Sequence, residues 1–367
     1  MKTTFSLSTF LCLAGLVAGC DGTLPTHPVQ GDSRLLQNYT RQPNGTGIHI
    51  GSTQPESWFG LAGTSLTWFM DGFSQHADGS FWARGWYSVD AGLIAAEAQV
   101  LRAEQGDASF LLKDIRTVGS RLQIDIADAQ GTTHTLQDAA LNGLTLVLRV
   151  PDLTGLLPST YRLRITSSQI LDSEFGDVYG YGVEARSSAP AATWSSYCRG
   201  PGDVAQGAVF YQGSQWNPLD GSRSDGSKRI TMTCETGSVA RCMRWGYRPW
   251  GSAANAQGVS TSLAEHHQAC IHMKRASYCG DSQSNTVDGT WIYIQDQLGP
   301  NLHTGSLDTI EAVWTAQGAA CLSNRRHPEL VFLGCAQPLP TCTAAQQANF
   351  LLATGLSPSG SLLGLAD

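Results

Sequence analysis

Residues 121–128 read Arg-Leu-Gln-Ile-Asp-Ile-Ala-Asp, and this stretch decides the fold of the first half of the chain. Leu122, Ile124 and Ile126 alternate with polar residues, and a period of two is typical of a β-strand with one buried face. Residues 128–131, Asp-Ala-Gln-Gly, predict a turn, and residues 132–136 predict a second, more polar strand. The sequence therefore predicts a β-hairpin over residues 121–136.

The same alternation extends outward from this hairpin. Residues 144–150 and 161–165 also alternate, whereas residues 93–104 fit a strand and a helix almost equally well. The chain has only 14% charged residues and contains 40 glycines, which favours a β-rich, turn-rich protein. We therefore expect an antiparallel β domain, a sandwich or a barrel, over residues 45–186.

A second domain is expected after residues 187–193, Ser-Ser-Ala-Pro-Ala-Ala-Thr, which are small, uncharged and typical of a boundary. It covers residues 194–342, is rich in cysteine and contains short helices. We expect these helices at 238–245, from Asp308, and after Ser262, where Glu265 completes a capping box. Residues 343–367 form a tail in which 343–353 predict one more helix. The fold class is β-rich α+β: an antiparallel β domain followed by a disulfide-rich domain with short helices.

Eight cysteines gather in this second domain, and none lies between Cys20 and Cys198. An even number of widely spaced cysteines in an exported chain indicates four disulfides. Zinc is the alternative, but it usually requires closely spaced pairs, and the chain has no Cys-x-x-Cys. Spacing alone leaves the connectivity open. The eight are Cys198, Cys234, Cys242, Cys270, Cys279, Cys321, Cys335 and Cys342.

The N-terminus predicts export. Lys2 precedes an uncharged apolar run over residues 5–19, which is too short to span a bilayer and is typical of a signal peptide. The run ends in Leu-Val-Ala-Gly-Cys at 16–20 and resembles the lipobox of bacterial lipoproteins. The resemblance implies removal of residues 1–19, lipid on Cys20, and a spacer over residues 20–44. We expect a location in the bacterial cell envelope, with the protein facing the periplasm or the cell surface and the membrane as its partner.

Charge argues against a nucleic-acid partner. Residues 21–190 contain 11 Lys+Arg and 18 Asp+Glu, and residues 191–342 contain 11 of each. Nucleic-acid binding requires a basic excess, which neither half has.

The second domain resembles the bacterial ADYC-domain family over residues 195–342. The resemblance rests on residues 230–237 (Ile-Thr-Met-Thr-Cys-Glu-Thr-Gly), 242–250, 267–270, 274–281 and 288–290. The family is named for Ala-Asp-Tyr-Cys, and here residues 276–279 read Ala-Ser-Tyr-Cys, so the acid is absent. The resemblance implies an exported, cysteine-rich domain and carries over no catalytic residue.

Two candidate sites follow from the residues. Aromatic and basic side chains gather in one segment, which predicts a contact surface for a protein or carbohydrate partner: Arg244, Trp245, Tyr247, Arg248 and Trp250. The other candidate is His266, His267 and Asp281, which would serve an exported hydrolase, with or without a metal. The tryptophans could equally fill a core, and the histidines could equally be structural.

We therefore interpret the chain as a lipid-anchored, non-enzymatic binding or structural protein, with an exported hydrolase as the alternative. We expect no cofactor and no metal.

Overall fold

A computed structural model of the chain describes residues 47–49, 68–89, 92–151, 158–171, 176–188, 191–199, 204–217, 221–255, 257–281, 283–287, 290–298, 310–343 and 350–356. All of them belong to one compact unit, Asp32–Asp367. The expected leader, Cys20 and the expected spacer over residues 20–44 lie outside these ranges.

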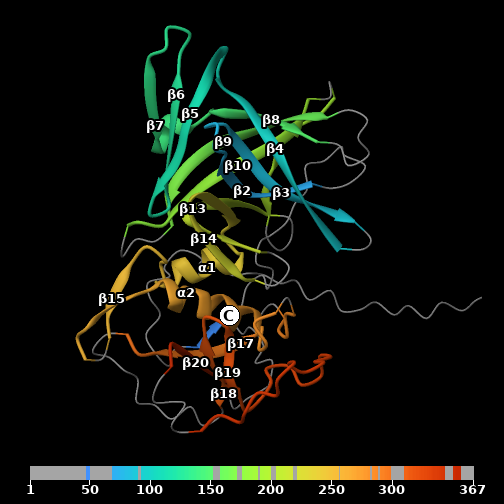
Figure 1. Ribbon diagram of the computed structural model, residues 1–367, viewed down its shortest axis with the longest axis vertical. Helices are drawn as coiled ribbons and strands as arrows, with labels where there is room; N and C mark the ends of the chain where they lie inside the picture. Colours follow the sequence, from blue (N-terminus) through green and yellow to red (C-terminus); the bar gives the residue numbers. More distant parts are fainter. Residues whose placement is uncertain are drawn as a thin grey trace, which may run out of the picture. The chain divides into compact units, whose positions relative to one another are not determined.

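Eight antiparallel strands close into a ring around the first core (Figure 1). Their order is β3, β2, β14, β13, β10, β9, β8 and β4, and β4 pairs again with β3. Of the two expected arrangements, the pairing is that of a barrel. The strands are β2 (Trp68–Gln75), β3 (Phe81–Val89), β4 (Gly92–Gln105), β8 (Thr145–Val150), β9 (Ser159–Ile170), β10 (Tyr179–Ser187), β13 (Ala205–Trp216) and β14 (Arg223–Cys234).

Three more strands extend the sheet from β4: β5 (Ala108–Val118), β6 (Arg121–Ala127) and β7 (Thr133–Gln137). The expected hairpin is confirmed as β6 and β7, with Leu122, Ile124 and Ile126 buried. A short 3-10 helix, η2 (Asp138–Leu141), follows β7. Two short strands, β11 (Ser195–Ser196) and β12 (Cys198–Arg199), pair with β10 and β13.

The ring is filled by alternate side chains from its strands. Trp68, Leu148 and Phe210 are nearly inaccessible to solvent and belong to one core cluster. Glycine is required at position 72, where β2 pairs with β14. Its φ is 151°, and an added Cβ would lie 1.9 Å from the carbonyl oxygen of Ile230. The core therefore depends on close backbone contact as well as on apolar side chains.

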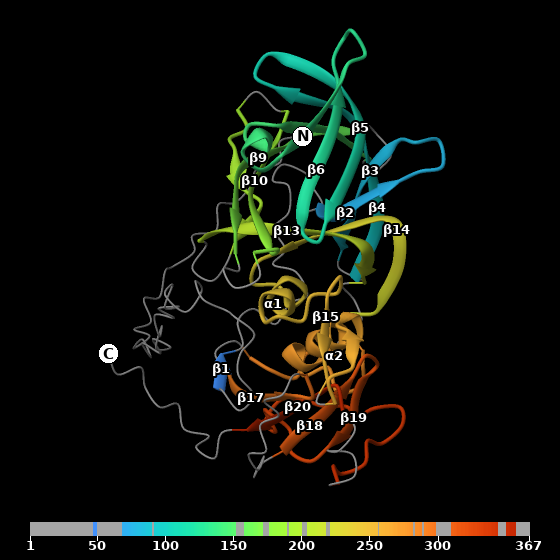
Figure 2. The same cartoon turned by 90° about the vertical axis from the view of Figure 1, so that its left-hand side faces the viewer.

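Two helices and a second sheet form the other core (Figure 2). Helices α1 (Ser238–Arg244) and α2 (Ala264–Arg275) pack with Val209 and Trp216 of β13 and with the second sheet. That sheet has the order β1 (Gly47–His49), β17 (Trp291–Asp296), β20 (Leu352–Leu356), β18 (Ile310–Thr315) and β19 (Gly318–Leu322). A separate pair joins β15 (Ser252–Ala254) to β16 (Ser260–Ser262).

The structure corrects two expected helices. The helix expected from Asp308 is instead a strand, β18, from Ile310 onward. Of the helix expected over 343–353, residues 344–349 lie outside the described ranges, and Leu352 and Ala353 at its end belong to β20, which lies between β17 and β18. Both strands are buried on both faces, so their apolar residues follow no period of two. The capping box is also wrong: the N-cap of α2 is Leu263, and Ser262 Oγ accepts a hydrogen bond from the Ala264 N–H.

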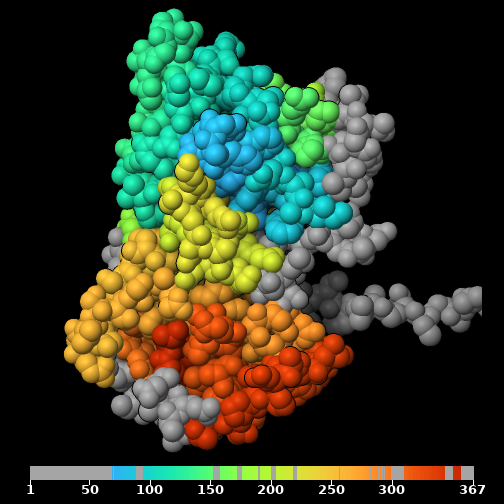
Figure 3. All heavy atoms as spheres, in the orientation of Figure 1, coloured from blue at the N-terminus to red at the C-terminus, as the bar shows by residue number. Residues whose placement is uncertain are grey.

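The large sheet continues across residues 187–193, where the sequence suggested a boundary. Strand β13 pairs with β10, and β14 pairs with β2. In the space-filling view, β2 (blue) and β14 (yellow) are neighbours on one surface (Figure 3). The ring therefore includes β13 and β14, which follow this stretch in the sequence.

Within the described residues, no helix is both long enough and apolar enough to span a bilayer.

Candidate functional site: an arginine face on the ring

The segment expected to form a contact surface is largely buried. Arg244, Trp245 and Tyr247 are only 2–3% exposed. The hydroxyl of Tyr247 donates a hydrogen bond to Asp296 Oδ2 at 2.9 Å, inside the second core. These three side chains therefore offer no surface to a partner, which corrects the expectation from sequence.

The rest of that segment joins two parts of the fold. The guanidinium of Arg248 lies 2.8 Å from Asp177 Oδ1, and the indole N–H of Trp250 donates to Asp177 Oδ2 at 2.9 Å. Trp250 also packs on Gly119, where an added Cβ would lie 3.0 Å from the indole nitrogen. Arg248 and Trp250 thus connect the segment after α1 to the loop before β10, and their contacts are structural.

The histidines of α2 face different partners. His267 is fully buried, and its Nε2–H donates to the carbonyl of Val239 at 3.0 Å. Burial lowers the pKa of His267 to about 3, so its imidazole is neutral at physiological pH. His266 instead stacks on Tyr247, with 6.4 Å between ring centroids.

The carboxylate of Asp281 also has a local partner, because its Oδ1 accepts a hydrogen bond from the backbone N–H of Gln283 at 3.0 Å. No group of three or more His, Cys, Asp or Glu among the described residues is arranged to hold a metal ion. The residues proposed for a hydrolase therefore have separate local roles.

The Ala-Ser-Tyr-Cys stretch at 276–279 ends helix α2. Ala276 has a left-handed backbone, with φ of 48°, and Ser277 donates a hydrogen bond from Oγ to the carbonyl of Asp281 at 2.5 Å. The Tyr278 hydroxyl donates to Glu311 Oε1 at 2.8 Å and accepts the Arg326 N–H at 2.9 Å. Cys279 forms a disulfide with Cys335. Every residue of the stretch thus makes a structural contact.

Tyr278 closes a buried ionic network. The side chains of Glu311 and Arg326 are both 0% exposed, and Arg326 NH2 lies 2.9 Å from Glu311 Oε2. Arg326 also donates to the carbonyl oxygens of Met273 and Lys274 at the end of α2. Burial, followed by the charge of Glu311, raises the pKa of Tyr278. Because water does not reach these groups, the network supports the fold and offers no site to a substrate.

All eight cysteines expected to pair do so. The bonds are Cys198–Cys234, Cys242–Cys270, Cys279–Cys335 and Cys321–Cys342. This connectivity was left open by the sequence.

Charged side chains gather instead on the outside of the ring, over β4, β8, β9 and β10. The pairing places Arg102, Val147, Arg162 and Arg186 in one cross-strand row. The next row contains Glu104, Thr145, Arg164 and Glu184. Gln99 and Arg149 pair in a third row. We define the arginine face as Arg102, Arg149, Arg162, Arg164 and Arg186, together with Trp194.

Two carboxylates pair with three of these arginines. Arg102 NH2 lies 2.7 Å from Glu104 Oε1, and Arg162 Nε lies 3.3 Å from Glu104 Oε2. Arg164 NH2 lies 2.5 Å from Glu184 Oε2. Within the described part of the chain, Arg149 and Arg186 form no ion pair, and Arg149 is exposed.

Trp194 orders two of the arginines. The guanidinium carbons of Arg164 and Arg186 lie 4.1 and 4.6 Å from the centroid of its ring. These are cation–π distances, which hold a guanidinium without neutralising its charge. The Nε–H groups of both arginines lack an acceptor among the described residues. Trp194 therefore positions charge that carboxylates do not fully balance.

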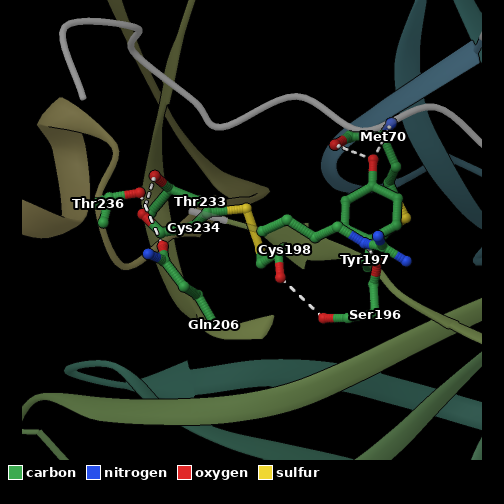
Figure 4. Close-up of a disulfide and its surroundings, with 9 residues drawn as sticks. Met70, Ser196, Tyr197, Cys198, Gln206, Thr233, Cys234 and Thr236 are labelled. Carbon is green, nitrogen blue, oxygen red and sulfur yellow. Dashed lines mark hydrogen bonds between the residues drawn. A yellow bond between two sulfur atoms is a disulfide. The ribbon is translucent and has the colours of Figure 1, made fainter. Parts of the chain in front are cut away.

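The segment after Trp194 is fastened to the ring at two points (Figure 4). The Tyr197 hydroxyl donates to the Met70 carbonyl at 2.9 Å and accepts the Met70 N–H. The adjacent Cys198 is bonded to Cys234 at the end of β14. Because β11 pairs with β10 through Ala185 and Ser195, Trp194 lies beside Arg186.

Sequence reasoning missed this face. Within β9, Arg162 and Arg164 alternate with the buried Tyr161, Leu163 and Ile165, and this signal is visible in the sequence. The neighbours of β9 are set by the ring, which no local pattern reveals.

Comparison with known protein families gives one match. The family described as the ADYC domain matches residues 138–328, more than half of the 367 residues. No curated protein and no solved structure matches the chain. The matched region begins at η2, well before residue 195, so it includes β8, β9 and β10 of the arginine face. By this match, the chain belongs to the ADYC-domain family.

Proposed function

We propose that this protein is exported, is anchored to a membrane of the bacterial cell envelope through lipid on Cys20, and acts there as a non-enzymatic binding module. Two features support export and anchoring. Residues 16–20 have the small-residue-then-cysteine pattern of a lipobox, and four disulfides suit an oxidising compartment.

The arginine face is the observation that supports a binding role. It presents five guanidinium groups, of which only three pair with a described carboxylate, and the described histidines proposed for catalysis are buried or separately bonded. Binding surfaces favour arginine because its planar group forms two parallel hydrogen bonds to an anion. This face replaces the segment 244–250 as the proposed site for a partner.

Metabolic labelling tests the anchor. Cells producing the full chain are fed a fatty acid that carries a detectable tag, and the protein is isolated and examined for the label. We expect label on the parent and on C12S, because Cys12 lies in the leader, and none on C20S. Label that persists in C20S, or an unlabelled parent, contradicts the proposal.

A further inference from the structure

We propose that the arginine face binds the anionic phospholipid surface of the membrane to which the chain is anchored. This inference rests on the proposed function and names the ligand of the binding module. The protein would then lie with β4, β8, β9 and β10 against the lipid headgroups.

Charge complementarity is the first argument. Five arginines against Glu97, Glu104 and Glu184 leave the outer side of these four strands at a net charge of +2, whereas the whole chain is at −7. An anionic membrane repels an acidic protein as a whole but attracts this face, which favours one orientation. Arg149 and Arg186 carry most of the effect, since no described carboxylate pairs with either.

The spacing of the donors suits a layer of phosphates. Neighbouring strands lie about 4.8 Å apart, and same-face residues on one strand lie about 7 Å apart. Guanidinium groups at this spacing each present a planar set of N–H donors to phosphate oxygens. Trp194 holds Arg164 and Arg186 from one side, which reduces the conformational entropy lost on binding.

Apolar neighbours favour a lipid surface over a soluble anion. Leu101 is 39% exposed and lies next to Arg102, where the register of β4 shifts. Trp82 pairs with Gln99, which pairs in turn with Arg149, so a half-buried indole lies in the same row. Tryptophan is enriched at the membrane interface, and an exposed leucine gains by contact with acyl chains. Neither would assist binding to free phosphate.

A lipid anchor on Cys20 permits this orientation. The chain from Cys20 to Gly47 reaches at most about 90 Å when fully extended. Covalent length therefore allows any face of the ring to meet the membrane.

Vesicle binding by the C20S full chain, produced in an oxidising compartment, tests the face without the lipid. The protein is sedimented with vesicles of phosphatidylcholine alone, or with a third of it replaced by phosphatidylglycerol, at low and high salt. R149A/R186A is the test variant, because neither side chain pairs with a described carboxylate that would be left unbalanced. K228A/R229A is the control, with the same charge change on β14, which pairs with none of the four strands.

We expect C20S to bind the anionic vesicles at low salt and to be released by salt. Each cation near such a surface contributes about fivefold, or about 1 kcal/mol, so R149A/R186A should weaken partitioning about 25-fold. The control should lose less than threefold. Unchanged urea unfolding of both variants excludes a folding defect.

Three results overturn the proposal: no binding of C20S to anionic vesicles, equal losses in R149A/R186A and the control, or binding of soluble polyphosphate without binding of vesicles. Failure of the anchor is seen separately, because fatty-acid labelling of the parent does not depend on the face.

Discussion

Glu311 and Arg326 carry opposite charges into a region that water does not reach. Removing both from water costs several kcal/mol, and their attraction offsets this cost only when the remaining hydrogen-bonding groups are satisfied. Here Tyr278 and the carbonyl oxygens of Met273 and Lys274 supply those partners. The network therefore ties the end of α2 to β18 in one arrangement.

Neutralising one member should be costly. In E311Q, the charge of Arg326 stays buried without its counter-charge, so we expect a loss of about 3–5 kcal/mol in the free energy of unfolding. D138N is the control, because Arg121 and Asp138 form an ion pair with both side chains more than one-third exposed. The free energy of unfolding of that variant should fall by at most about 1 kcal/mol. Urea unfolding measures both, and equal losses would contradict a role for burial.

His267 should make stability depend on pH. Its pKa falls from 6.5 to about 3 on folding, so the unfolded chain takes up a proton first as the solution is acidified. Its contribution to stability is therefore complete above pH 6.5 and is lost as the pH falls towards 3. We expect protonation of this group in the unfolded chain to lower the free energy of unfolding by about 2 kcal/mol between about pH 7.5 and about pH 5.

Substitution isolates that contribution. H267Q should flatten the dependence of the urea midpoint on pH over this range, whereas H134Q should not, because the His134 side chain is 50% exposed. If the urea midpoints of H267Q and the parent change with pH in parallel, His267 does not control the dependence of stability on pH.

Single residues were the hardest to place from sequence. Arg244 was expected on a contact surface, yet all seven residues of α1 are buried. A helix pattern identifies an apolar side but does not show whether other elements cover the polar side. Trp245 and Tyr247 were assigned to a surface because aromatic and basic residues cluster in their segment, and such a cluster does not show whether other elements cover it.

At the scale of elements, local patterns predicted strands with one buried face and amphipathic helices. Strands β6, β8 and β9 and helices α1 and α2 all lie where the sequence indicated them. The failures are β18 and β20, which are covered on both faces and so lack the alternating pattern. Their position in a sheet depends on distant partners.

The Cys198–Cys234 bond should stabilise the segment that carries Trp194. It closes a loop with a sequence separation of 36 residues, for which chain entropy suggests about 4 kcal/mol. In C198S/C234S we expect faster hydrogen exchange over residues 195–199 than in the parent, with little change over residues 161–165 of β9. Uniform acceleration across both segments would instead indicate global destabilisation.

At the scale of the molecule, the ring requires strands from both sides of residues 187–193. A chain that ends at Pro190 lacks β13 and β14, which close the ring between β10 and β2. We expect this truncation to lack the near-ultraviolet dichroism of packed aromatic side chains and to be digested rapidly by protease. A cooperative, protease-resistant fragment would show that residues 45–186 form an independent domain.

The order of strands was the least predictable feature. The pairings β2–β14 and β4–β8 join segments far apart in the chain, and composition and periodicity contain no information on such contacts. The arginine face depends on those pairings, which explains why its five arginines appeared in the sequence only as scattered charges.

The disulfides have a consequence for maturation. Cys198–Cys234 and Cys242–Cys270 each join cysteines that are consecutive in the sequence, but Cys279–Cys335 and Cys321–Cys342 interlace. In the proposed export, with the N-terminus crossing the membrane first, Cys321 emerges while Cys279 still awaits Cys335. An oxidase that couples cysteines as they appear produces a Cys279–Cys321 error, which only thiol–disulfide exchange removes. Under the proposed export, correct pairing of these four cysteines therefore requires exchange of that first bond, which is the reaction of a disulfide isomerase.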